Sequence, residues 1–313
     1  MNAGEEFDYI LGKIEAAKFA QEPFPHLYVE DFLAPQHLEL LTTHGQIKFP
    51  PQQTTASLID SLVSRGWQVH PFPGCTTSVD EYLKCYENGV WPVDRKRLEG
   101  FGVALRLKEY EDGTAQRLVG FLNSPAFKAC LERKFDIARP NRIETAIHKY
   151  LSGYEISPHP DKRSKCLTYL VNINTEQNSE GFSIHTHLMR FRNDKKFIYD
   201  FWKYNENCDT DWVPWDWCES VRELRKNNSL VMFAPSWNTL HAVKIRYDHL
   251  KFQRTQIYGN LWYTDVPFSL PTVNYDQFDI KPPEKEANGQ MRQRISDLLP
   301  QQMKDGIKKL MKF

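Results

Sequence analysis

Three side chains that could hold one metal ion stand in a widely spaced pattern. His159 and Asp161 are separated by a single residue, and His241 follows His159 by 82 positions. Two imidazoles and one carboxylate can bind Fe(II) on one side of the ion and leave its other positions open. An arginine after the second histidine, either Arg246 or Arg254, could hold an acidic co-substrate, because a guanidinium binds a carboxylate through two parallel hydrogen bonds. This set indicates a non-haem iron site.

The spacing of His159 and Asp161 suits an extended chain. Side chains at positions i and i+2 of a strand point to the same face, about 7 Å apart, and both can reach one ion. His241 must come from another strand, since it precedes the alternating residues Val243 and Ile245. A His-x-Asp pair occurs by chance in many chains. The pair is a stronger signal when a later histidine and arginine accompany it.

Charge and strand parity favour Arg254 over Arg246 as the co-substrate residue. Fe(II), Asp161 and a doubly charged 2-oxoacid together leave one negative charge, which needs a cation. If residues 241–246 form one strand, Arg246 faces away from His241, whereas Arg254 opens the next strand. Arg246 remains the alternative. The residues that would share the face of Arg254 are Gln256, Tyr258 and Asn260.

The second half of the chain reads as a β unit, either a sandwich or a jelly roll, with flanking helices. Short runs rich in Val, Ile, Tyr, Phe and Trp follow one another without helices between them. The runs are Ile143–Tyr150, Cys166–Ile173, Ser229–Ala234, Leu240–Arg246 and Thr255–Tyr263. Residues 1–140 read mostly helical with one extended piece. The expected elements there are helices at Phe7–Phe19, Pro35–Thr43 and Gln116–Lys134 and a strand at His26–Phe32.

Two segments stand apart from these elements. Residues 193–228 carry Trp202, Trp212, Trp215 and Trp217, and we interpret the segment as an insertion over one end of the β unit. It could be a substrate lid or a satellite hydrophobic cluster that fixes a long loop. Residues 267–313 form a tail that ends in a basic helix. We therefore expect one catalytic domain, with its core at residues 141–266.

Three stretches of this chain resemble the prolyl-hydroxylase-like branch of the 2-oxoglutarate/Fe(II) oxygenases. They are Tyr150–Asp161, Leu167–Asn174 and the run from Leu230 through His241 and Arg254 to Trp262. The resemblance spans about residues 141–264, with a looser match at Pro23–Leu41. It implies a double-stranded β-helix core. Two features depart from the family: the gap from His241 to Arg254 is longer than expected, and the tryptophan-rich insertion has no equivalent.

The resemblance also implies roles for six residues. His159, Asp161 and His241 would be the catalytic iron ligands, Arg254 would bind the distal carboxylate of 2-oxoglutarate, and Tyr150 and Asn172 would contact the same co-substrate. The implied reaction uses O2, hydroxylates a substrate C–H bond and releases succinate and CO2, with ascorbate in a supporting role. The metal carboxylate, absent in the halogenases of this family, is present as Asp161, which favours hydroxylation.

Composition limits the partners of the protein. Forty basic and forty acidic residues cancel, so charge gives no reason to expect nucleic acid or an anionic membrane. No apolar run is long enough to cross a bilayer, and the N-terminus does not read as a signal peptide, so we expect a cytoplasmic protein with six free thiols. A homodimer through the C-terminal helix is a further hypothesis.

Several alternatives stay open. We expect His148, His185 and His187 to be structural or pocket-lining residues. A small molecule or amino acid is favoured as the substrate over a peptide or protein residue. The competing functions are a jelly-roll binding or metal-sensing protein without turnover and a cupin-like zinc enzyme.

Overall fold

The computed structural model describes residues 5–75, 77–89, 98–267, 270–273 and 275–278. The chain divides into two compact units, residues 1–273 and 274–313. The second contributes a single described turn of 3-10 helix, Tyr275–Gln277. The basic helix expected at residues 284–313 lies outside the described residues. No helix in the described part of the chain has the length and apolar character needed to cross a bilayer.

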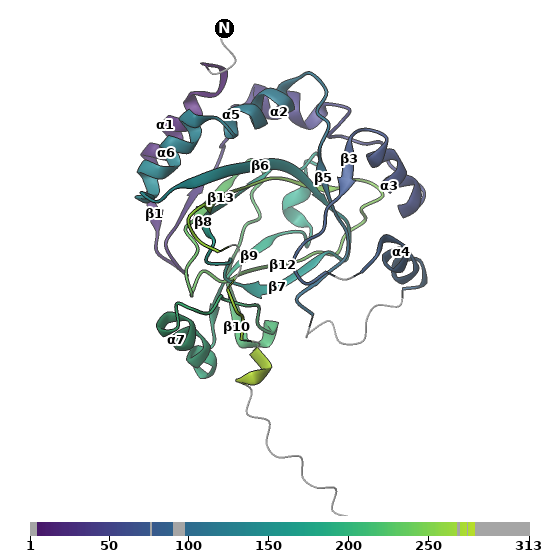
Figure 1. Ribbon diagram of the computed structural model, residues 1–313. Helices are drawn as coiled ribbons and strands as arrows, with labels where there is room; N and C mark the ends of the chain where they lie inside the picture. The colour runs from purple at the N-terminus through teal and green to yellow at the C-terminus, as the bar shows by residue number, and fades with distance from the viewer. Residues whose placement is uncertain (1–4, 76, 90–97, 268–269, 274, 279–313) are drawn as a thin grey trace, which may run out of the picture. The chain divides into compact units, whose positions relative to one another are not determined.

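Eight antiparallel strands, β6 to β13, form two facing sheets, as in a double-stranded β-helix or jelly roll (Figure 1). The larger sheet contains the order β11-β8-β13-β6, and the smaller sheet contains the order β10-β9-β12-β7. The strands are β6 Asn141–Tyr150, β7 Glu155–His159, β8 Lys165–Asn172, β9 Thr186–Phe191, β10 Cys218–Glu223, β11 Leu230–Phe233, β12 His241–Lys244 and β13 Arg254–Tyr263. The predicted jelly-roll core with flanking helices is confirmed.

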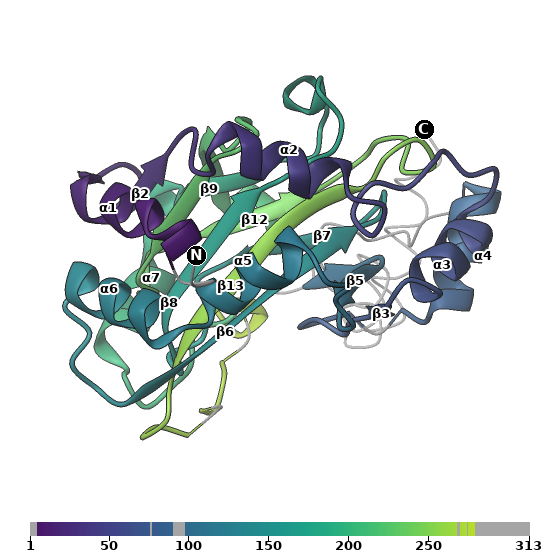
Figure 2. The ribbon, with the colours of Figure 1, turned by 90° about the horizontal axis from the view of Figure 1, so that it is seen from above.

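Four helices cover the outer face of the larger sheet, at the top of Figure 1 and nearest the viewer in Figure 2. They are α1 Tyr9–Ala16, α2 Pro35–Thr43, α5 Thr114–Leu122 and α6 Pro125–Phe135. The prediction of one helix at Gln116–Lys134 was wrong, because Ser124 caps a new helix through the backbone N–H of Phe127 and Pro125 occupies its first turn. The main hydrophobic core lies between these helices and the sheet.

The N-terminal flank also adds strands, which corrects the expectation of a single extended piece. Strands β1, β2, β3 and β5 extend the larger sheet at its two edges, and β4 extends the smaller one. Their bounds are β1 Phe19–Ala20, β2 His26–Val29, β3 Trp67–Val69, β4 Gly100–Phe101 and β5 Ala104–Leu107. Helices α3 Thr55–Val63 and α4 Val79–Asn88, each opened by a capping box, complete this flank.

Gly259 shows how tightly the centre of the larger sheet is packed. It lies between Thr145 of β6 and Tyr169 of β8, and a Cβ added to it would lie 2.1 Å from Cζ of Tyr169. The absence of a side chain lets the Tyr169 ring cross the glycine, so that its hydroxyl hydrogen-bonds to Thr145. This β13 position therefore requires glycine.

The tryptophan-rich stretch is shorter than the sequence indicated. It contains the 3-10 turn Asn193–Lys195, helix α7 Lys196–Tyr204 and the 3-10 turn η5 Trp215–Trp217. The residues that follow, assigned to the insertion in the sequence analysis, form β10, which pairs with β9 as a strand of the jelly roll. The expected insertion of residues 193–228 thus reduces to residues 193–217.

Candidate metal centre

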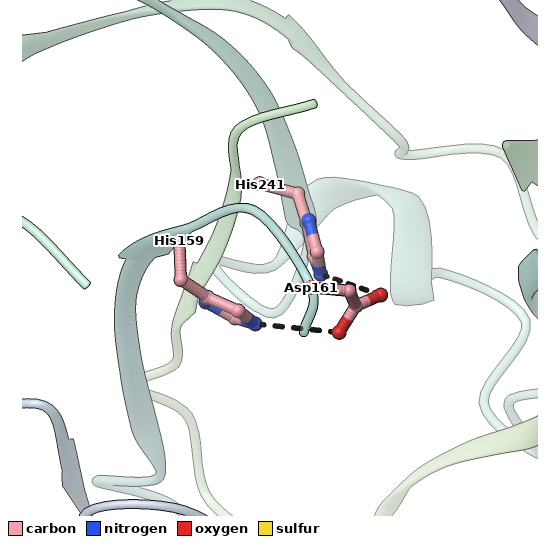
Figure 3. Close-up of side chains that lie close together, drawn as sticks. All are labelled: His159, Asp161 and His241. Atoms are coloured by element: carbon pink, nitrogen blue, oxygen red, sulfur yellow. Dashed lines mark ion pairs between the residues drawn. The ribbon is translucent and has the colours of Figure 1, made fainter. Parts of the chain in front are cut away.

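The two histidines of the sequence pattern face one another across neighbouring strands of the smaller sheet. His159 is the last residue of β7, His241 is the first residue of β12, and the two are paired in register. Their ring centroids are 4.3 Å apart. Asp161 follows the end of β7, and its carboxylate lies beside both rings (Figure 3).

The ligand atoms of the three residues converge. Nε2 of His159 lies 3.9 Å from Oδ1 of Asp161, and Nε2 of His241 lies 3.9 Å from Oδ2. One donor atom from each residue lies within 4.8 Å of the other two. No other group of three or more potential ligands occurs among the residues that the structure describes.

Backbone carbonyls fix the orientation of both imidazoles. Nδ1 of His159 is 2.8 Å from the carbonyl oxygen of Ser157, and Nδ1 of His241 is 3.1 Å from that of Thr239. A carbonyl only accepts, so each Nδ1 carries the hydrogen and each Nε2 presents a lone pair toward Asp161. This is the arrangement that metal-binding histidines adopt.

The electrostatics of the three groups fit a cationic metal. Burial, reinforced by the neighbouring His241, lowers the pKa of His159 to about 3, and burial also lowers the pKa of His241, so both rings are neutral near pH 7. Burial alone would raise the pKa of Asp161, but the adjacent Lys165 ammonium holds it below its usual range. Two neutral nitrogens and one anionic oxygen are the donor set of a non-haem Fe(II) site.

Two residues that the sequence pattern did not indicate, Lys165 and Thr168, hold the Asp161 carboxylate. Nζ of Lys165 lies 2.5 Å from Oδ1, and the hydroxyl of Thr168 donates to Oδ2. Lys165 also donates to the hydroxyl of Tyr258 at 2.8 Å. Asp161 and Lys165 are separated by a loop, and a spacing of four residues in a loop does not predict that two side chains meet. The sequence therefore holds no signal for this contact.

Arg254 is a buried cation without a carboxylate partner among the described residues. It opens β13 in the larger sheet and donates through Nη2 to Thr186, 2.9 Å away at the start of β9 in the smaller sheet. Arg254 is 2% exposed, and burial lowers the pKa of its guanidinium. Leaving such a charge unpaired costs several kcal/mol, which indicates that an anion belongs beside it.

Tyr150 lies directly against Arg254. The two residues are paired between β6 and β13, and the guanidinium carbon is 4.6 Å from the centre of the Tyr150 ring. The Tyr247 hydroxyl joins their backbones, because it donates to the Tyr150 carbonyl at 2.5 Å and accepts from the Arg254 N–H at 2.8 Å. Arg246, the alternative, is exposed to solvent.

Asn172 and the secondary histidines have structural partners. Both amide hydrogens of Asn172 are donated, to the carbonyls of Leu224 and Lys226, and its oxygen accepts from Gln256. His185 lies 3.2 Å from the Glu180 carbonyl, and His187 lies 2.8 Å from the Ser220 hydroxyl. His148 is buried on the Tyr150 face of β6, and burial lowers its pKa well below 6.5.

The tryptophans pack against the smaller sheet and its neighbours. The Trp202 ring lies 5.9 Å from Phe191 of β9, and Trp215 donates to Glu155 of β7. Trp217 is 5% exposed and precedes β10. These contacts favour the satellite cluster over the lid.

Comparison with known proteins gives remote likenesses only. No protein-family model and no curated protein sequence matches the chain. Among solved structures, a prolyl-4-hydroxylase of Pseudomonas putida is 11% identical, with a TM-score of 0.34 over 66% of this chain and 98% of that one. A prolyl 4-hydroxylase of Phytophthora capsici is 11% identical, with a TM-score of 0.37 over 87% and 72% of the two chains. The 2-oxoglutarate-dependent epimerase SnoN of nogalamycin biosynthesis is 11% identical, with a TM-score of 0.35 over 86% and 88%. At these values the likenesses decide nothing about function.

Proposed function

We propose that this protein is an Fe(II)- and 2-oxoglutarate-dependent dioxygenase that hydroxylates a C–H bond of a small molecule or amino acid. The observation that carries the proposal is the pairing of two features in one jelly roll. A His-Asp-His donor set, in which Asp161 and His241 are buried, converges on one point, and a buried arginine that lacks a carboxylate partner among the described residues joins the two sheets. The first suits ferrous iron, and the second suits a dicarboxylate.

Each residue then has a defined task. His159, Asp161 and His241 hold the ferrous ion on one side, with the imidazoles fixed by backbone carbonyls. Arg254 binds the distal carboxylate of 2-oxoglutarate, while the face of the Tyr150 ring lies against the guanidinium. When bound, the iron and 2-oxoglutarate supply O2 activation, with release of succinate and CO2. The donors of Asn172 are used within the protein, so the proposal does not include it as a co-substrate contact.

The charge balance of the site favours a substrate with an acidic group. Fe(II), Lys165 and Arg254 bring four positive charges, while Asp161 and 2-oxoglutarate bring three negative ones. One positive charge remains, and Lys165 has Asp161 as its only ion-pair partner among the described residues. When Asp161 also binds the metal, it neutralises the Lys165 ammonium only in part. A second anion near Lys165 would then be favourable. An amino acid or other carboxylic acid supplies it.

Anaerobic spectroscopy tests the proposal without knowledge of the substrate. Addition of Fe(II) and then 2-oxoglutarate is expected to produce a weak visible metal-to-ligand charge-transfer band, and the Asp161→Ala variant is expected to lack it. Release of succinate in air, screened against amino acids, their amides, peptides and neutral metabolites, then identifies the substrate class. A folded, iron-loaded protein without the band favours a binding protein, and tight zinc without a response to 2-oxoglutarate favours a cupin-like enzyme.

A further inference from the structure

Asp161 differs from the two histidines in how its backbone is held. His159 and His241 lie in strands and are positioned by the β7–β12 ladder. Asp161 lies in the connection 160–164 between β7 and β8, which belongs to neither strand. Its position must therefore come from contacts outside the sheet hydrogen bonds.

Those contacts come from residues 202–213, which run from the last turn of helix α7 into the chain after it. The Thr210 hydroxyl donates to the Asp161 carbonyl at 3.0 Å, and the Val213 N–H donates to the Pro158 carbonyl at 2.8 Å. The carboxylate of Asp209 accepts from the backbone N–H of Arg163 at 2.9 Å. Segment 202–213 thus contacts the chain just before, at and just after the proposed metal ligand.

Arg163 completes these contacts from the opposite direction. Its side chain donates to the Cys208 carbonyl at 2.7 Å and to the Trp202 carbonyl at 2.6 Å. Trp202 lies in the last turn of α7, where carbonyls lack helical partners and the helix dipole attracts a cation. The partners are themselves fixed, because Trp202 is 1% exposed and Asp209 is 1% exposed.

We propose that segment 202–213 positions Asp161 as a metal ligand and that Arg163 is the positioning residue through which it acts. This inference rests on the proposed metal site and assigns a role to the insertion, which is to order the one ligand that the β ladder leaves unsupported. Outer contacts of this kind commonly change metal affinity by roughly 10- to 100-fold when they are removed.

The test compares the metal affinity of matched arginine variants. Arg163→Gln loses the charge and the fork geometry, and Arg192→Gln is the control, because its side chain pairs only with the exposed Asp194 in the described chain. Anaerobic Co(II) titration, followed by the ligand-field spectrum, is expected to show roughly 10-fold or greater weakening for Arg163→Gln and a changed spectrum, with the control like wild type. Arg163→Lys keeps the charge beside α7 and should recover part of the affinity.

Thermal unfolding of the metal-free proteins separates positioning from general stability. The apo Tm of Arg163→Gln should stay close to that of Arg192→Gln while the Co(II) affinity falls. If Arg163→Gln does not fold, Thr210→Val removes the hydroxyl that donates to the Asp161 and Pro160 carbonyls and is measured in the same way. Wild-type Co(II) affinity and spectrum in the folded variant, or an affinity loss matched by the control, would overturn the inference. In that case the wild-type response to Fe(II) and 2-oxoglutarate still stands, whereas a wild-type protein that binds neither metal overturns both proposals.

Discussion

Lys165 Nζ lies 2.5 Å from Oδ1 of Asp161, so the proposed metal carboxylate already has a buried cation beside it. Their mutual attraction outweighs burial and raises the pKa of Lys165, as it lowers that of Asp161. The Tyr258 hydroxyl and the rings of Tyr258 and Trp262 surround the same ammonium. Lys165 is therefore the group through which the charge of a substrate can be tested.

Lys165→Met should abolish preference for an acidic substrate. Once a substrate is identified, kcat/KM is measured for the acid and for its neutral amide. We expect wild type and Lys165→Arg to favour the acid, and Lys165→Met to lose roughly 10-fold or more of that preference, since a hydrogen bond to a charged group contributes about 1.5–3 kcal/mol. A preference that survives in Lys165→Met would contradict the acidic-substrate proposal.

Asp161→Asn should remove metal binding and also destabilise the apo protein. Lys165 would be left buried without its counterion, at a cost of about 3–5 kcal/mol. The double variant Asp161→Asn/Lys165→Met should recover much of the Tm, because both charges are gone, yet it should still fail to bind Co(II). Wild type, Asp161→Asn, Lys165→Met and the double variant form a double-mutant cycle, which is measured by calorimetry and by metal titration. Equal Co(II) affinity in Asp161→Asn and wild type would exclude Asp161 from the site.

Arg254→Met should weaken the binding of 2-oxoglutarate. In wild type, a saturating amount of 2-oxoglutarate with Co(II) is expected to raise the Tm, because a ligand that binds the native state stabilises it. Loss of a buried charge pair costs about 2–5 kcal/mol, so the affinity of Arg254→Met should fall by roughly 30-fold or more. Arg246→Met is the matched control, since Arg246 is exposed. If Arg246→Met shows the larger loss, the assignment of Arg254 is wrong.

Lys149 should give the fold a pH-dependent stability. It is 0% exposed, hydrogen-bonds to Thr255 and contacts the rings of Phe49 and Trp67, and burial lowers its pKa to about 7. Between pH 7 and about 10.5 the unfolded chain keeps the Lys149 proton and the folded chain releases it, so the free energy of unfolding should rise with pH.

Lys149→Met tests this directly. At pH 7 and below, the folded protein must hold a buried charge, so the substitution should stabilise it by an amount on the order of a few kcal/mol. The gain should shrink as the pH approaches 10. Chemical denaturation across this range measures both effects, with Lys48→Met on the surface as the control. A gain that does not change with pH would show that packing, not charge, is responsible.

Much of the fold could be predicted because its signals are local. The runs of β-branched and aromatic residues correspond to β6, β8, β11, β12 and β13, and Pro35–Thr43 forms α2 with its predicted bounds. Strand β2 lies where the strand at His26–Phe32 was expected, but the other short strands of the N-terminal flank escaped prediction, since two to four residues carry too little periodicity. Strand β10 was missed because only Cys218 in it is buried and four of its six residues are polar or charged, so no alternating pattern marks it. Ser124-Pro125 is a helix-start signal that indicates the break between α5 and α6, but the prediction of one helix ignored it.

The sequence by itself determined the chemistry of the site: which residue types are present, their spacing along each strand, and the parity that favours Arg254 over Arg246. Residue types and spacings are read directly from neighbouring positions, and the alternation of side chains along a strand gives the face on which each lies. Tertiary structure alone decided that His159 and His241 pair in register, that Lys165 neutralises Asp161 and that Arg254 reaches Thr186 across the two sheets. Such contacts join segments that are distant along the chain or lie in loops, and only assembly of the sheets and their connections fixes their distances.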